Sequence, residues 1–255
     1  MTNVHVLDPK PDGAPAVLLL HGLGATGASW TLQLPALMEA GFRPLAPDLP
    51  GFGRSPYDGR GWSLSRLAKI LADILVERGL DSSHVVGLSM GGVLAQQFAH
   101  EFPSRTRKLV LVSTFAVLRP DSFSGWFYFL RRFLGVVLGG PQTQARLVAE
   151  RIFPYPEQEP LRQILLETIL QADQDAYRAA MRALAMFDSR PWLSTLTMPT
   201  LIISGEDDTT ISPAQQRMLA QRIPGAQQVI LQAAGHAVPV DQPEVFNRLL
   251  LEFLR

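Results

Sequence analysis

The residues Gly87-Leu88-Ser89-Met90-Gly91 spell the pattern G-x-S-x-G between an apolar run, residues 84–86, and a helical pattern, residues 92–99. This context predicts a sharp strand-to-helix turn, because the flanking glycines leave room for a backbone at positive φ. The turn lifts the serine hydroxyl clear of the sheet. The helix behind it points free N–H groups and the positive end of its dipole toward the same place. Ser89 is therefore predicted to be a nucleophile.

Short apolar runs alternate with helical patterns along most of the chain. Strands are predicted at residues 4–7, 16–20, 42–46, 84–88, 108–112, 200–204 and 227–231, and helices at residues 30–40, 63–78, 213–222 and 243–254. This alternation is typical of a mostly parallel sheet with helices on both faces. The predicted fold class is α/β, with a doubly wound, mostly parallel sheet of about seven strands.

The alternation stops between residues 118 and 192, where helical stretches are punctuated by prolines. This interruption predicts a helical cap, residues 118–192, inserted into an α/β core formed by residues 1–117 and 193–255. The aromatic run around Trp126 approaches the length of a membrane-spanning helix, but a glycine and two arginines interrupt it. A helix that covers an apolar pocket is therefore favoured over a stable membrane insertion.

Composition excludes several classes of function. The chain has 255 residues, no net charge and a pI near 7.0, so it lacks the electrostatic footprint of a nucleic-acid-binding protein. It has no cysteine, and its five histidines show no zinc-binding spacing, so no metal is expected. The N-terminus lacks the pattern of a secretory signal, and a cytoplasmic protein is expected.

A serine nucleophile needs a base that accepts its proton. His236 follows the last predicted strand and precedes the last helix, on a loop that can reach over the sheet. His5 lies on an edge strand and His100 at the end of a helix. His84 is the first residue of the strand that leads to Ser89, so it lies at the opposite end of the sheet from the serine. His236 is therefore the predicted base.

The base in turn needs a carboxylate that orients it. Asp208 follows the predicted strand at residues 200–204 and precedes His236, so the chain order is Ser, Asp, His. Asp207 competes for this role, because neighbouring residues in a loop can exchange roles. Asp208 is preferred, and the choice between the two carboxylates stays open.

The segment His21-Gly22-Leu23-Gly24 follows the predicted central strand and can bring backbone N–H groups together. The N–H groups of Leu23 and Met90 are the predicted donors to an oxyanion. Residues 22–27 also match the dinucleotide-binding pattern G-x-G-x-x-G, with Asp48 about 20 residues further on as a candidate ribose ligand. The downstream serine, aspartate and histidine favour a hydrolase.

The segments LLLHGLGATGASW, PDLPGFGRSP, VVGLSMGG, PTLIISGEDDTTISP and AAGHAVPVDQPE, in this order, resemble the α/β-hydrolase fold superfamily. The part before Ala16 is short, so the leading antiparallel hairpin of the family is expected to be reduced to one strand. The chain is most similar to serine carboxylesterases, enol-lactone hydrolases and acyl-carrier-protein methyl ester esterases. Ser89 separates it from haloalkane dehalogenases and epoxide hydrolases, which use aspartate as nucleophile.

The resemblance implies a serine hydrolase that cleaves an ester or lactone of a small to medium apolar acyl group through an acyl-enzyme, without a cofactor. The expected partners are a small-molecule ester and, as a candidate, an acyl carrier protein. A slow-turnover ligand sensor and a carbon–carbon bond hydrolase are the alternatives. The expected substrate-binding residues, in addition to the two oxyanion donors, are Gly22, Phe115, Phe123, Trp126, Phe127 and Met186.

Overall fold

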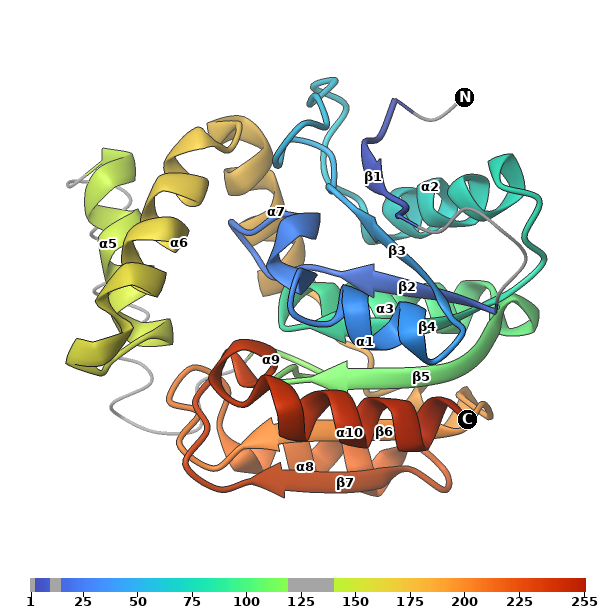
Figure 1. The fold of residues 1–255 in the computed structure, drawn as a ribbon. Helices are drawn as coiled ribbons and strands as arrows, with labels where there is room; N and C mark the ends of the chain where they lie inside the picture. Colours follow the sequence, from blue (N-terminus) through green and yellow to red (C-terminus); the bar gives the residue numbers. More distant parts are fainter. Residues whose placement is uncertain (1–2, 10–14, 119–139) are drawn as a thin grey trace.

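The structure, a computed structural model, describes residues 3–9, 15–118 and 140–255. A seven-stranded sheet with the order β1-β3-β2-β4-β5-β6-β7 forms its centre (Figure 1). Only the edge strand β1 runs antiparallel to its neighbour among these strands. The strands are β1 (Val6–Leu7), β2 (Ala16–Leu20), β3 (Arg43–Pro47), β4 (Ser83–Leu88), β5 (Thr106–Val112), β6 (Thr200–Gly205) and β7 (Gln227–Leu231). The predicted mostly parallel α/β sheet is confirmed.

Helices cover both faces of the sheet, because its central strands are apolar on both sides. On β2, Leu18 and Leu20 belong to one buried cluster, whereas Val17 and Leu19 belong to the other. Successive side chains of a strand point to opposite faces, so this split is what a doubly wound sheet requires. The first cluster includes α2 (Leu64–Glu77), α3 (Met90–Glu101) and α8 (Pro213–Arg222), and the second includes α1 (Leu34–Glu39) and α10 (Pro243–Leu254), which lie in front of the sheet in Figure 1.

Two helix starts show how local sequence sets the boundaries. Ser63 caps α2 as predicted, with its side chain accepting a hydrogen bond from the N–H of Arg66. The single helix predicted over residues 30–40 is wrong, since a 3-10 turn, Gly27–Trp30, precedes the short helix α1. Pro35 lies in the first turn of α1. Pro35 has no N–H to donate to the carbonyl of residue 31, so an α-helix cannot run through this position. The helix therefore begins in the turn that contains Pro35.

Among the described residues between β5 and β6, three segments form α-helices. They are α5 (Gly140–Ile152), α6 (Glu159–Gln171) and α7 (Gln174–Met186), with the 3-10 turn η3 (Pro156–Gln158) before α6, and we call residues 140–187 the helical insertion. In Figure 1 the arrowheads of β2, β5 and β7 point toward the side on which α5 and α6 lie. The helical insertion is therefore placed beyond the carboxyl ends of the parallel strands.

The aromatic run expected to line a pocket lies outside the described residues, and so do Phe123, Trp126 and Phe127. Among the helices of residues 3–9, 15–118 and 140–255, none combines the length and the apolar character needed to cross a membrane. The helical insertion is held to the loops of the core at the start of α7. Asp173 caps this helix through its side chain and donates its N–H to the carbonyl of Gly51 at 2.9 Å.

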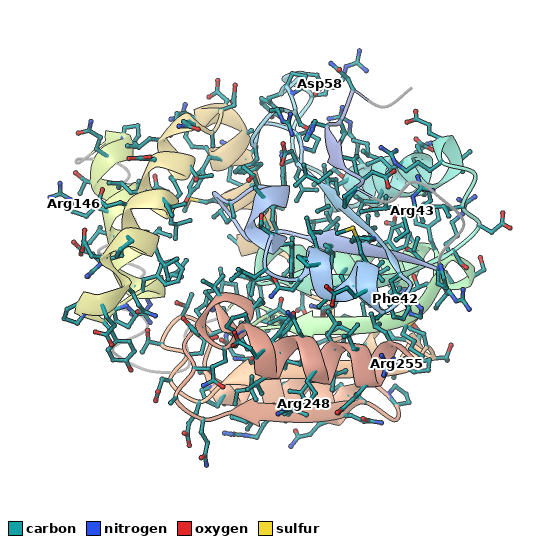
Figure 2. The ribbon with its side chains drawn as sticks, viewed as in Figure 1. Phe42, Arg43, Asp58, Arg146, Arg248 and Arg255 are labelled. Carbon is teal, nitrogen blue, oxygen red and sulfur yellow. The ribbon has the colours of Figure 1, made fainter. Side chains whose placement is uncertain are left out.

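Most charged side chains are exposed, and Asp58 and Arg146 lie at the periphery in Figure 2. Arg43 on β3 is an exception, since only 6% of it is exposed. Its guanidinium donates two hydrogen bonds to the carboxylate of Asp8, at 2.9 and 2.6 Å. A buried charge is tolerated when it is paired in this way, so Arg43 is a structural residue that holds the segment after β1 against β3.

Candidate active site

Ser89 occupies a strained turn between β4 and α3. Its φ and ψ are 54° and −112°, in a region that residues with a side chain rarely adopt. The turn is held by the N–H of Ser89, which donates to the Val112 carbonyl at 2.9 Å, and by the Thr114 hydroxyl, which donates to the Ser89 carbonyl at 2.8 Å. The structure thus has the predicted strand-to-helix turn, with its backbone fixed by the neighbouring strand.

The glycines of the motif allow β4, α3 and β2 to approach one another closely. A Cβ atom on Gly87 would lie 2.2 Å from the carbonyl oxygen of Gly91, and one on Gly91 would lie 2.1 Å from the carbonyl oxygen of Leu20. Both distances are far shorter than any carbon–oxygen contact allows. The two glycines are therefore required because any side chain would push α3 away from the sheet.

The loop after β2 is fixed by the buried side chain of His21. Its Nδ1 lies 2.8 Å from the Gly22 carbonyl oxygen, and its Nε2 lies 3.0 Å from the N–H of Leu49. Because Nε2 accepts a hydrogen bond, the proton of a neutral imidazole is on Nδ1, which donates to Gly22. The carbonyl of Gly22 thus points at the ring. In a trans peptide, the N–H of Leu23 then points the opposite way.

Gly22 brings this loop next to the serine. A Cβ atom on Gly22 would lie 3.8 Å from the Cβ atom of Ser89. Met90, the other predicted oxyanion donor, follows Ser89 directly and begins α3. Free N–H groups at a helix start and in a glycine loop can bind negative charge. The two segments predicted to supply the oxyanion donors are therefore neighbours in the structure.

Burial lowers the pKa of His21 to about 4, because desolvation disfavours the imidazolium more than the Gly22 carbonyl and Asp48 favour it. Burial also lowers the pKa of His84, on β4, to about 4, and the positive charges of Arg107 and Lys108 act in the same direction. Both imidazoles are thus neutral at neutral pH. His21 is suited to orient a loop, not to take up a proton during turnover.

These two histidines predict that acid destabilises the fold. Their pKa values are near 4 in the folded protein and 6.5 when unperturbed, so the unfolded chain binds more protons between these limits. The free energy of unfolding is therefore unaffected by these imidazoles above pH 6.5 and falls as the pH is lowered from 6.5 to 4. The loss due to His21 amounts to about 3 kcal/mol. Urea unfolding of wild type and His84→Gln from pH 4 to 7 tests this. The variant should lose less stability on acidification, and equal slopes would contradict the assignment.

Asp208 and His236 meet at the ends of β6 and β7. Nδ1 of His236 lies 2.9 and 3.1 Å from the two carboxylate oxygens of Asp208, and both residues are buried. The Asp208 carboxylate also accepts hydrogen bonds from the N–H groups of Thr210 and Ile211, at 2.8 and 2.9 Å. Asp207, in contrast, is exposed. Of the two candidate acids, the structure brings only Asp208 to the imidazole.

The loops that carry Asp208 and His236 pack backbone against backbone. A Cβ atom on Gly205 would lie 2.1 Å from the carbonyl oxygen of Gly235 and 2.3 Å from that of Ala234. The N–H of Asp207 donates to the Ala234 carbonyl at 3.0 Å. Gly205, at the end of β6, is thus the position at which the two loops are allowed to touch.

Gly205→Ala is therefore expected to separate the two loops. The added methyl group has no space, so the free energy of unfolding should fall by about 1–3 kcal/mol, the usual cost of overpacking. Any activity that depends on the pair Asp208–His236 should fall further than the folded fraction explains, because the pair is displaced. Urea unfolding and activity of the purified variant are the measurements. An unchanged unfolding midpoint would contradict the close packing of Gly205 against the carbonyl groups of Ala234 and Gly235.

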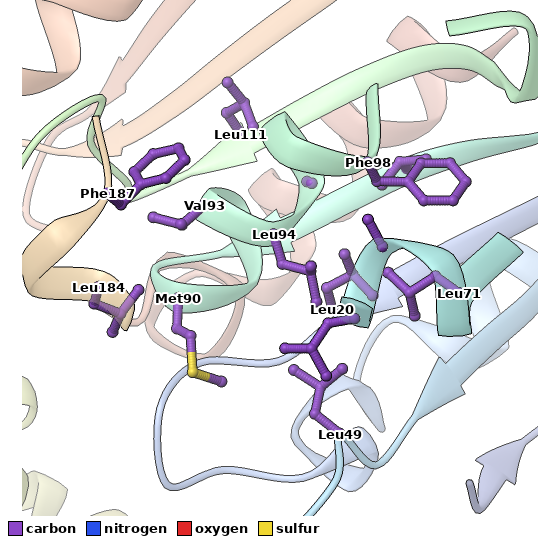
Figure 3. Close-up of a cluster of buried hydrophobic side chains, with 14 of the residues drawn as sticks. Leu20, Leu49, Leu71, Met90, Val93, Leu94, Phe98, Leu111, Leu184 and Phe187 are labelled. Carbon is purple, nitrogen blue, oxygen red and sulfur yellow. The ribbon is translucent and has the colours of Figure 1, made fainter. Parts of the chain in front are cut away.

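The predicted substrate-binding residues do not all come together. Met90 and Phe115 are buried in one apolar cluster with Leu184 and Phe187 of the helical insertion, and Figure 3 shows Met90 beside Leu184. Leu23 is half-buried against the same cluster. Met186, however, is 85% exposed at the end of α7. Two residues along a helix correspond to a turn of about 200°, so Met186 points away from the side that Leu184 buries.

The sequence interpretation missed the inner face of the helical insertion. Its buried apolar side chains in this cluster include Ile169, Tyr177, Leu184 and Phe187. The helical spacing of Tyr177, Ala180 and Leu184 was a signal that could have identified this face. The insertion also contacts the loop after β2, since a Cβ atom on Gly24 would lie 2.4 Å from Cγ1 of Ile169.

The dinucleotide-binding alternative does not fit the structure. The loop at residues 22–27 leads into a 3-10 turn of four residues, Gly27–Trp30, and not into an α-helix that could bind a pyrophosphate. The carboxylate of Asp48 accepts hydrogen bonds from the N–H groups of Gly27 and Arg54, at 2.8 and 2.9 Å, and lies 3.1 Å from Nδ1 of His5. Its oxygens are thus used to hold loops together.

No group of three or more His, Cys, Asp or Glu side chains among the described residues is arranged to hold a metal ion. What the site contains instead is a serine in a strained turn, a histidine bound to a buried carboxylate, and a glycine loop beside the serine. Each follows a parallel strand of the same sheet, at its carboxyl end. This arrangement can perform acyl transfer with protein groups alone.

Comparison with known proteins agrees with this arrangement. The sequence profile described as the alpha/beta hydrolase fold matches residues 15–243. The chain belongs to the α/β hydrolase fold family. The resemblance inferred from the sequence segments is thereby confirmed, together with the fold class.

This α/β hydrolase is similar over nearly its whole length to proteins of different names. One relative from Variovorax paradoxus is named for carbamate hydrolysis, RutD, and is 33% identical over 252 residues, which cover 96% of this chain and 93% of the relative. The pimeloyl-[acyl-carrier protein] methyl ester esterase of Aeromonas hydrophila is 30% identical over 258 residues, covering 94% of this chain and 95% of the relative. These relatives are hydrolases of esters or related bonds.

The solved structures that resemble this α/β hydrolase include the enol-lactonase from Burkholderia xenovorans LB400. It superposes with a TM-score of 0.88 at 26% sequence identity, and the match covers 98% of this chain and 96% of the enol-lactonase. The likeness therefore covers almost the whole length of both chains.

Proposed function

We propose that this α/β hydrolase is a serine hydrolase that cleaves a carboxylic ester or lactone of a small to medium apolar acyl group through an acyl-enzyme. The observation that carries the proposal is the hydrogen-bonded pair of His236 Nδ1 and the Asp208 carboxylate, at 2.9 Å, at the same sheet edge as the strained Ser89. The esterase and lactonase names of its relatives support the same class of reaction.

In this mechanism the hydroxyl oxygen of Ser89 attacks the substrate carbonyl carbon while its proton passes to Nε2 of His236. Asp208 accepts the Nδ1 proton in a hydrogen bond, which fixes the tautomer and stabilises the imidazolium. The N–H groups of Leu23 and Met90 donate to the oxyanion. The alcohol leaves with the proton from Nε2, and a water activated by His236 then attacks the acyl-enzyme and releases the acid and free Ser89.

The proton transfer needs Ser89 Oγ within about 3 Å of Nε2, and such catalytic contacts often tighten only when the substrate is bound. Asp208 holds Nδ1, so Nε2 on the far side of the ring remains for the serine. The neutral, buried His21 has no part in the proton transfer. It supports the reaction by keeping the Gly22 carbonyl turned away, which leaves the Leu23 N–H for the oxyanion.

The helical insertion acts in this proposal as a cap, residues 118–192, between the two parts of the core. Its inner face contributes apolar side chains to the cluster around Met90, and these favour an acyl chain over a sugar or a nucleotide. The expectation that Phe123, Trp126 and Phe127 line the pocket stays a prediction. Replacing Met186 should leave substrate preference unchanged, because its side chain faces solvent.

Carbamate hydrolysis is a second candidate, favoured by the name of the relative that is 33% identical to this chain. The chemistry requires no other groups, because a carbamate carbonyl is attacked by the same serine and its oxyanion is bound by the same N–H groups. A carrier-protein ester, such as the name of the Aeromonas hydrophila relative describes, is a third type of substrate with the same ester bond. An acyl carrier protein is therefore kept as a candidate partner.

A panel of p-nitrophenyl acetate, butyrate and octanoate, simple lactones and matched aryl carbamates tests the proposal. We expect saturable turnover of at least one ester or lactone and covalent labelling of Ser89 by a fluorophosphonate, located by mass spectrometry. Ser65→Ala, an exposed serine on α2, is the control that should keep both properties. Labelling of Ser89 without turnover would favour the slow-turnover ligand sensor. Neither labelling nor turnover would refute a serine hydrolase.

A further inference from the structure

Asp241 binds the loop of the proposed catalytic histidine without taking part in any step above. One of its carboxylate oxygens accepts a hydrogen bond from the N–H of Gly235, the residue before His236, at 2.9 Å. The other oxygen accepts a hydrogen bond from Nε2 of Gln158, at 3.0 Å. Gln158 ends η3 in the helical insertion. A single carboxylate thus joins the histidine loop, residues 235–241, to the insertion.

The bond to Gly235 closes the histidine loop on itself. Residues 238–241 form the short helix α9, in which the N–H of Asp241 donates to the Ala237 carbonyl at 2.9 Å. His236 lies between the two ends of this closed loop. The N–H of Gly235 and the carboxylate are six residues apart, so this side chain ties together the two ends of the histidine loop.

The same part of the helical insertion also contacts the acid loop. Arg151, at the end of α5, donates a hydrogen bond to the carbonyl of Thr209, next to Asp208. A Cβ atom on Gly235 would lie 3.9 Å from the carbonyl oxygen of Ile152. Residues 151–158 therefore contact both loops that hold the proposed acid and base. Because of these contacts, a movement of the insertion would also move the loop that orients His236.

We propose that Asp241 is a positioning residue that fixes the histidine loop for catalysis and links it, through Gln158, to the helical insertion; this inference rests on the proposed function of His236. The charged groups that act on Asp241 are His236 on its own loop and Asp208 on the loop after β6, while the insertion presents the neutral amide of Gln158.

Burial raises the pKa of Asp241, while the Gly235 N–H and the charge of His236 act in the opposite direction. The bond to Gly235 and the charge can be separated by substitution. Asn at position 241 keeps an oxygen for the Gly235 N–H but loses the charge. It also turns an amide N–H₂ toward Nε2 of Gln158, so the present hydrogen bond is lost, and a flipped Gln158 amide restores a link only by giving up the Tyr155 N–H. Ala at position 241 removes the bond to Gly235, the charge and the bond to Gln158.

The test compares Asp241→Ala, Asp241→Asn and Gln158→Ala with p-nitrophenyl acetate, whose small acyl group makes few contacts. A displacement of about 1 Å in a catalytic group can cost on the order of 100-fold in rate. We expect kcat to fall about 10- to 100-fold for Asp241→Ala and less for Asp241→Asn and Gln158→Ala, with KM little changed. The controls are the exposed carboxylates Glu244→Gln on α10 and Glu157→Ala beside Gln158, which should stay near wild type.

The split between kcat and KM separates a positioning role from a merely structural one. A kcat of Asp241→Ala within twofold of wild type, measured per folded enzyme, would overturn the proposal. So would a loss of activity that appears only in KM.

A readout without substrate keeps this proposal separate from the proposed function. The Nδ1 proton of His236, assigned by its absence in His236→Ala, should give a slowly exchanging NMR signal in wild type and Glu244→Gln. In Asp241→Ala it should exchange faster or disappear. An unchanged signal in Asp241→Ala would overturn the positioning role even if the enzyme is a hydrolase. If the NMR signal changes as expected but the protein cleaves no ester, the positioning role of Asp241 stands and only the proposed reaction is refuted.

Discussion

Ser89→Ala is expected to lower kcat for ester hydrolysis by at least about 10⁴-fold, because the proposed nucleophile is removed while the oxyanion donors and the base remain. The free energy of unfolding should change little. The strained backbone at Ser89 is held by hydrogen bonds of its N–H and carbonyl with Val112 and Thr114, and alanine keeps both. The measurements are single-turnover kinetics with p-nitrophenyl butyrate and urea unfolding of the same preparation.

Ser113→Ala is the matched control for this experiment. Ser113 also follows a strand of the sheet, β5, and also has a positive φ, 45°, but its side chain is completely buried. Its substitution should leave kcat within a few-fold of wild type. More than a tenth of wild-type activity in Ser89→Ala would show that the nucleophile is another residue. Equal losses in the two variants would show that the turn, and not the Ser89 hydroxyl, is what matters.

Asp208→Asn is expected to lower kcat by about 10³- to 10⁴-fold, whereas Asp207→Asn should cost no more than a few-fold. An amide at position 208 presents an N–H₂ group to Nδ1 of His236, which then has to flip or to change its tautomer. Asp207 is exposed, so neutralising it removes only a solvated charge. Kinetics of both variants with one ester, at the pH of maximal wild-type activity, make the comparison.

The control for this pair is the free energy of unfolding. The Asp208 carboxylate accepts hydrogen bonds from the N–H groups of Thr210 and Ile211, and the remaining oxygen of an asparagine can keep these, so Asp208→Asn should stay folded. Comparable activity losses in Asp207→Asn and Asp208→Asn, or the reverse order, would refute the assignment of Asp208.

The elements around Ser89 could be predicted because their signals are local. The apolar run of β4, the glycines and the helical pattern of α3 lie within about 20 residues of one another and dictate one turn. The strand at residues 227–231 and the helix at residues 213–222 were predicted with the bounds found in the structure. The helix expected over residues 30–40 failed because Pro35 permits an α-helix only from its own first turn onward.

The side to which each apolar residue at the end of α7 points does not follow from its own hydrophobicity, although the helical spacing of Tyr177, Ala180 and Leu184 marks one buried face. Leu184, Met186 and Phe187 are all apolar, yet Leu184 and Phe187 are buried and Met186 is 85% exposed. Which of them faces inward depends on how α7 is rotated against α3. That rotation is set by contacts distant in sequence, such as the bond from the Asp173 N–H to the Gly51 carbonyl.

By itself, the sequence determined the order of strands and helices, the turn that presents Ser89, and the loops on which a histidine and a carboxylate could meet. These properties depend on periodicity and on glycines, which act over a few residues. Only the tertiary structure decided that Asp208 and not Asp207 binds His236, since neighbouring side chains in a loop differ only in direction. It alone revealed Asp241, whose partner Gln158 is 83 residues away. A hydrogen bond between such distant residues exists only after the chain has folded, because neither residue carries a local pattern that specifies the other.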